Sequence, residues 1–141
     1  MIDIEDKVFD TVATAVTAEF SGCLMSSVYL RTPASFPCVC LYEADNSVNT
    51  PSRTLDSIEN HASLMYEVNV FSNLAGSRKS EAKAIAEVVD KTMAQLGFTR
   101  IFKNPIPNED ITIYRLVMRY TALVAKGQTV GAKTQYKIYN N

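Results

Sequence analysis

Few side chains in this sequence are of the types that catalyse reactions or bind metals. The 141 residues include three cysteines and one histidine. Cys38, Cys40 and His61 would together make an incomplete metal site, since structural zinc sites usually have four Cys or His ligands in recognisable pairs. In a strand, Cys38 and Cys40 share one face and behave as small hydrophobes. We therefore expect reduced thiols, with no metal and no other cofactor.

The same scarcity limits catalysis. A Ser-His-Asp triad or a Cys–His pair would have to use His61, which stands at the start of an expected strand. Glu109 and Asp110 are adjacent carboxylates in an expected turn, and neighbours in sequence do not face each other as catalytic pairs do. The glycines are scattered, so the chain has no P-loop or dinucleotide fingerprint. The sequence therefore gives no reason to expect an enzyme.

Charge and composition argue against two classes of partner, nucleic acids and membranes. The net charge is −1 and the sequence pI is about 5.8, whereas nucleic-acid binders usually carry a basic excess. No apolar run reaches the length needed to span a bilayer, and the first six residues lack the features of a signal peptide. We expect no membrane partner, no specific nucleic-acid partner, and folding in the cytoplasm.

One small basic cluster stands out. Arg78, Lys79 and Lys83 lie at the expected start of a helix, and helix N-termini attract anions. Without a wider basic field, a solvated turn is the favoured interpretation and a phosphate site is the alternative.

The hydrophobic pattern predicts two helices and five strands. Residues 3–20 have apolar residues at Ile4, Val8, Val12 and Val16. A second apolar stripe predicts a helix over residues 80–96, followed by Gly97 in a left-handed conformation. Period-two patterns predict strands over 27–31, 38–43, 61–72, 98–103 and 111–124.

These elements predict an α+β fold with a mixed, mostly antiparallel sheet and two helices packed on one face. We expect a single domain over residues 1–125 and a C-terminal arm over residues 126–141. The expected loop over residues 44–59 is long and polar, so it is either a contact segment or simply mobile. Arg53 is its candidate contact residue, because arginine is enriched at interfaces.

Several motifs resemble a family of small tail proteins of tailed bacteriophages and prophages. These are Tyr66–Asn73 (YEVNVFSN), Glu81–Asp90 (EAKAIAEVVD), Leu96–Arg100 (LGFTR), and Pro105–Asn108 (PIPN) followed by Ile113-Tyr114-Arg115 and Arg119-Tyr120. The group is the tail terminators, also called tail completion or head–tail joining proteins. The likeness covers about 60 residues, spanning a strand, a helix and a hairpin.

The resemblance implies a structural virion protein with no cofactor. It would assemble in the host cytoplasm into an oligomeric ring, commonly a hexamer, that caps the tail tube and joins it to the neck. Its partners would be further copies of itself, the tail tube protein, neck or connector proteins, and the sheath if the tail is contractile. The alternatives are another neck component (a head-completion or adaptor protein) and, in a different class, a small metal-dependent nuclease or other enzyme.

The candidate subunit or tube contacts fall in three places. Arg53 lies in the expected loop, and Arg78 and Lys79 lie at the start of the second helix. The arm contributes Tyr136, Ile138 and Tyr139, for which we expect no core partner within the domain. A frayed terminus is the alternative for the arm.

Overall fold

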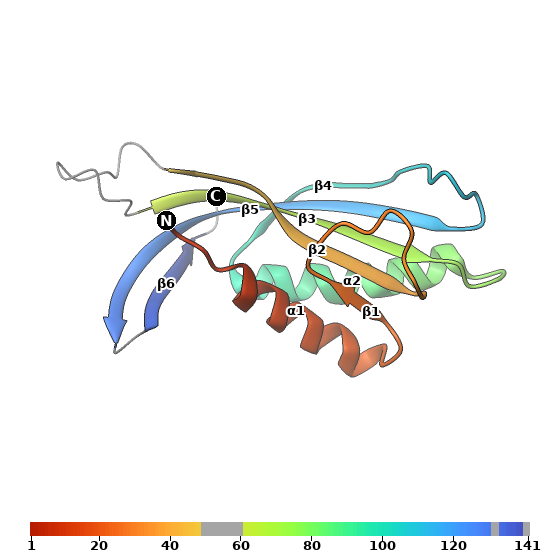
Figure 1. Ribbon diagram of the computed structural model, residues 1–141, viewed down its shortest axis with the longest axis horizontal. Coiled ribbons are helices and arrows are strands. Elements are labelled where there is room, and N and C mark those ends of the chain that lie inside the picture. Colours follow the sequence, from red (N-terminus) through yellow and green to blue (C-terminus); the bar gives the residue numbers. More distant parts are fainter. Residues whose placement is uncertain (49–60, 131–132, 140–141) are drawn as a thin grey trace.

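The computed structural model describes residues 1–48, 61–130 and 133–139 (Figure 1). Along this part of the chain the elements are α1 (Glu5–Glu19), β1 (Leu24–Ser26), β2 (Cys38–Val48), β3 (His61–Ser72), α2 (Arg78–Leu96), β4 (Thr99–Pro105), β5 (Tyr114–Val130) and β6 (Lys133–Tyr139). Arg53 and the rest of the segment from 49 to 60 lie outside the described residues.

The strands form one mixed sheet in the order β1-β2-β3-β5-β4. β1 runs parallel to β2, and the other pairs are antiparallel. β6 pairs with the far end of β5, beyond the stretch that pairs with β4. Both helices cover the same face of the sheet (Figure 1). The expected α+β fold, with a mostly antiparallel sheet and two helices on one face, is confirmed.

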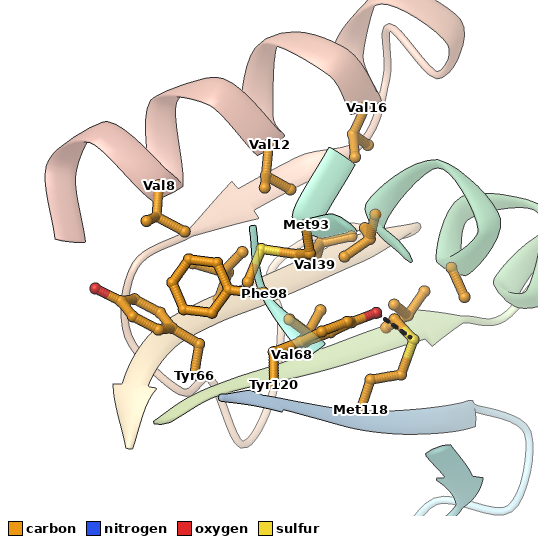
Figure 2. Close-up of a cluster of buried hydrophobic side chains, with 14 of the residues drawn as sticks. Val8, Val12, Val16, Val39, Tyr66, Val68, Met93, Phe98, Met118 and Tyr120 are labelled. Carbon is orange, nitrogen blue, oxygen red and sulfur yellow. Dashed lines mark hydrogen bonds between the residues drawn. The ribbon is translucent and has the colours of Figure 1, made fainter. Parts of the chain in front are cut away.

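α1 forms where the sequence predicts it. Oδ1 of Asp3 accepts a hydrogen bond from the backbone N–H of Glu5 at 3.1 Å, which satisfies one of the free donors at the helix start. Val8, Val12 and Val16 are completely buried and point toward the sheet (Figure 2). The helix is therefore held by its apolar stripe, as its four-residue spacing indicates.

The core lies between the helices and the sheet. Tyr66 and Val68 of β3 and Met118 and Tyr120 of β5 project into it beside the helix side chains (Figure 2). The hydroxyl of Tyr120 donates to Oδ1 of Asp90 at 2.8 Å, so this buried phenol is tied to α2. Such a bond offsets the cost of burying a hydroxyl.

Two expectations about the first strands are wrong. Residues 27–31 are not a strand: β1 ends at Ser26 and pairs in parallel with β2, while Val28 is 60% exposed. β2 does not end at residue 43 but continues to Val48, across an irregularity between Glu43 and Asp45. Polar residues hide this extension because the strand is largely exposed there.

The C-terminal part also differs from expectation. β5 begins at Tyr114 rather than at residue 111 and continues to Val130, and β6 folds back onto it. Tyr136 and Ile138 pack against the main core. The expectation that these side chains lack a local core partner is therefore wrong, because β5 supplies one.

Gly97 lies where the end of α2 approaches β6, and its substitution tests the backbone conformation there. It ends α2 with φ at 103°, and a Cβ added there would lie 3.0 Å from Cγ2 of Ile138. Gly97→Ala should lower the unfolding free energy by roughly 1–2 kcal/mol from the left-handed backbone alone. Urea denaturation measures this.

The matched control is Gly22→Ala, since a Cβ at Gly22 would meet nothing within 4 Å and its φ is not positive. Equal stability of the two variants would contradict the left-handed backbone described at Gly97.

Candidate functional site

The face of the sheet opposite the helices, called here the far face, carries its own small cluster. Cys38, Cys40 and Phe71 are completely buried there. Leu30 and Phe36, from the segment between β1 and β2, and Ile113, from the segment before β5, pack against them. These two segments therefore cover one end of the far face.

A polar network runs beside this cluster. Nε of Arg119 donates to Oε1 of Glu67 at 3.0 Å, and the hydroxyl of Tyr42 donates to Oε2 of Glu67. Nδ2 of Asn69 also donates to Oε2 of Glu67, at 3.2 Å. At the other end, Nε of Arg115 donates to Oδ1 of Asn69 at 2.8 Å. The network thus links β2, β3 and β5.

Burial and hydrogen bonding oppose each other at Glu67. Burial would raise the pKa of this carboxyl, but the hydrogen bonds from Tyr42, Arg119 and Asn69 outweigh it, so its pKa lies below the usual 4.5. Burial, and then the neighbouring Glu67, raise the pKa of Tyr42. The phenol therefore stays protonated and acts as a donor to the carboxylate.

Arg115 lies on the far face near the start of β5, opposite Phe71. Its guanidinium carbon is 5.3 Å from the ring centroid of Tyr29 and 6.0 Å from that of Phe71. Contact with aromatic faces favours a cation and restrains its movement. The guanidinium is held by stacking on these rings and by its bond to Asn69.

A cavity of about 550 Å³ opens beside Arg115. We call it the Arg115 cavity, and its lining includes Tyr29, Phe36, Pro107, Glu109, Ile113 and Arg115. This volume lies within the range of small-molecule sites, roughly 300–1,000 Å³. It is formed by the segment between β1 and β2 on one side and the turn between β4 and β5 on the other.

The acidic groups of the cavity already have partners. Oε2 of Glu109 accepts from Arg31 at 2.9 Å, in an ion pair whose two side chains are both largely exposed. The carboxylate of Asp110 accepts from both the hydroxyl and the backbone N–H of Thr112, which lower its pKa. Among the described residues, the side chains of Glu109 and Asp110 contact other partners and form no hydrogen bond with each other, so they do not form a catalytic pair.

Cys38, Cys40 and His61 are where the sequence predicts them. Cys38 and Cys40 share the far face as buried thiols, and burial, aided by Glu81, raises the pKa of Cys23 to about 11. His61 is the first residue of β3, its ring 6.4 Å from that of Tyr139. Within residues 1–48, 61–130 and 133–139, no three His, Cys, Asp or Glu side chains are placed to hold a metal.

The other candidate contact residues lie elsewhere. Arg78 and Lys79 are exposed in the first turn of α2. Tyr139 is 37% exposed on β6, with Nζ of Lys137 4.9 Å from its ring centroid. These residues and Tyr136 and Ile138 are absent from the Arg115 cavity lining.

Sequence reasoning missed the Arg115 cavity. Its signal was the charge pattern on two strands, with Glu67 and Asn69 on one and Arg115 and Arg119 on the other. The register places Glu67 opposite Arg119 and Phe71 opposite Arg115. That register, and the fold of residues 27–37 over the far face, are not encoded in any short motif.

Comparison of the chain with protein-family models finds no match, and comparison with curated proteins finds none either. No helix in the described part of the chain is long and apolar enough to cross a membrane.

Glu67 provides a pH test of the network. Its lowered pKa means that the ionised carboxylate stabilises the fold at neutral pH, and that this contribution is lost as the pH falls through the folded-state pKa. Glu67→Gln should therefore be less stable than the wild type near pH 7, and the difference should shrink as the pH falls below the usual 4.5. Urea midpoints across pH measure it.

Glu43→Gln is the control of opposite sign. Burial raises the pKa of Glu43, and nearby acidic residues raise it further. A hydrogen bond from Asn46 lowers this pKa but does not outweigh them. At neutral pH this variant should gain stability relative to wild type, and the gain should vanish in acid. If the Glu67→Gln difference stays constant across pH, Glu67 is not held ionised by this network.

Proposed function

We propose that this chain is a structural subunit of a phage tail, a tail terminator that forms a ring on the tail tube and joins it to the neck. The resemblance supports this through motifs that fall on adjoining elements. YEVNVFSN lies on β3 and the residue after it, and EAKAIAEVVD lies within α2. The Arg119 motif lies on β5, and so does the Arg115 motif except for its first residue, Ile113. β3 is paired along its whole length with the first part of β5, up to Ala125, and α2 packs on both.

The observation that carries the proposal is the exposed edge of the sheet. β4 pairs with β5 on one side, and no other strand of the described residues pairs with it. Ile101 of β4 is 52% exposed, and Ile111, in the turn that follows, is 85% exposed. An unpaired strand edge with exposed apolar side chains is a ready surface for another chain.

The same edge has features that limit indiscriminate pairing. Its register is irregular between Arg100 and Phe102, and β4 carries Lys103 and ends at Pro105. A lysine, a proline and a bulge are the devices by which edge strands avoid aggregation. A fitted neighbouring subunit is the partner such an edge suits, as in a closed ring.

The test is the native mass of the purified protein, with or without tail tubes. The wild type should form a closed oligomer, commonly a hexamer. Ile101→Lys should remain folded but lose the oligomer, because it places a solvated charge in the proposed contact. The control is Val48→Lys, which changes a valine that is 44% exposed at the end of β2.

Imaging distinguishes the terminator from another neck protein. Negative-stain images should place the ring at the ends of tail tubes; binding to the portal instead would favour an adaptor. A protein that stays monomeric in the presence of both would refute a ring-forming role. Metal-dependent cleavage of nucleic acid by the purified protein would favour the nuclease alternative.

A further inference from the structure

Arg115 has donors that the structure leaves unused. A guanidinium carries five N–H groups, and the Nε–H of Arg115 is taken by Asn69. Among the described residues, neither amino group of Arg115 donates a hydrogen bond to a protein acceptor. No carboxylate of these residues forms an ion pair with Arg115. The side chain is partly exposed, and its two amino groups are not among the buried polar atoms that lack a partner, so they are open to solvent and to an incoming ligand.

The charges of the far face leave Arg115 uncompensated. The polar network contains Arg115, Arg119 and Glu67, and the carboxylate of Glu67 is paired with Arg119. Two cations therefore share one anion, and the excess positive charge lies at the end of the network that lines the cavity. Partly buried charges are ordinarily paired, so this end of the network is suited to an incoming anion.

The acidic residues of the lining do not supply that anion. Glu109 is paired with Arg31, and Asp110 is held by the donors of Thr112 in its own turn. Asp110 is fully exposed to solvent, where screening weakens its effect on an anion bound at Arg115.

The rest of the lining defines the body of the ligand. Phe36, Pro107 and Ile113 contribute apolar surface, and Tyr29 offers an aromatic ring stacked on the guanidinium. A planar guanidinium suits a carboxylate, which it can bind through two parallel hydrogen bonds. The site thus combines the cation of Arg115, unpaired among the described residues, with apolar walls, beside the ion pair of Arg31 and Glu109.

We infer that the Arg115 cavity is a binding site for a carboxylate group attached to an apolar body. Two sources share that chemistry: a small organic acid and the free C-terminal residue of a protein chain. The carboxylate would lie against the amino groups of Arg115, and the apolar body would pack between the segment after β1 and the turn before β5. The turn between β4 and β5 contributes to both this cavity and the proposed ring contact, but Arg115 lies on the far face and Ile101 on β4, so variants at these two residues test the two proposals separately.

The experiment is a binding titration of the whole chain, followed by NMR or calorimetry. 3-Phenylpropanoate is the small acid, and 3-phenylpropanamide is its neutral match. An acetylated tripeptide ending in leucine, with a free or an amidated C-terminus, represents the chain end. The carboxylate form of at least one pair should bind at least tenfold more tightly than its amide, and the pair that does so identifies the source.

Variants locate the site. Arg115→Gln should lose at least tenfold in affinity for the carboxylate, and Arg115→Lys should retain part of it. Since Arg115 also supports the fold, Thr32→Asp is the second variant. Thr32 is an exposed lining residue, so a carboxylate there should weaken binding several-fold without disturbing the network. Thr32→Asn introduces a neutral side chain of the same size as aspartate, and this variant should bind the carboxylate as the wild type does.

Several outcomes would overturn the inference. These are equal affinity for acid and amide in both pairs, no binding of either acid at millimolar concentration, and unchanged binding by a folded Arg115→Gln or by Thr32→Asp. Loss of the ring in the Ile101→Lys variant would leave carboxylate binding intact, so failure of one proposal is distinguishable from failure of the other.

Discussion

β3 and β5 are paired without a break from His61 opposite Ala125 to Ser72 opposite Tyr114, and the rest of the structure depends on this register. Because side chains alternate along a strand, one register decides the composition of both faces at once. It places Tyr66, Val68, Met118 and Tyr120 under the helices. A slip by one residue would bury Arg119 in the core, at a cost that no pairing there would offset.

The same register builds the far face. Glu67 lies opposite Arg119, where cross-strand opposite charges stabilise a sheet, and Phe71 lies opposite Arg115. Asn69, which is completely buried, connects the two ends by donating to Glu67 and accepting from Arg115. The Arg115 cavity is thus a consequence of strand pairing, completed by the segments that flank β1 and β5.

Strong local patterns made much of the fold predictable from the sequence. The bounds of β3 agree with the alternation of Tyr66, Val68 and Val70, and Gly97 takes the left-handed conformation expected after α2. The sequence did not predict the extension of β2 because its residues are polar and typical of a loop. In the structure, Nδ2 of Asn46 donates to the carbonyl of Ile2 and to the side chain of Glu43, so this polar residue is accommodated within a strand.

The candidate site was less predictable. Leu30 belongs to a segment whose alternation is typical of a strand, yet it packs on the far face as part of a loop. Ile138 is one of few apolar residues near the C-terminus, and only the course of β5 to Val130 gives it a core to pack against. In both cases a distant segment decides the structure, and no local pattern encodes that contact.

The register of β3 against β5 is tested most directly by interstrand NOEs between backbone protons in solution. The account predicts contacts that pair Glu67 with Arg119 and Phe71 with Arg115. Contacts that instead pair Glu67 with Met118 or Tyr120 would move the arginines to the other face and contradict the account.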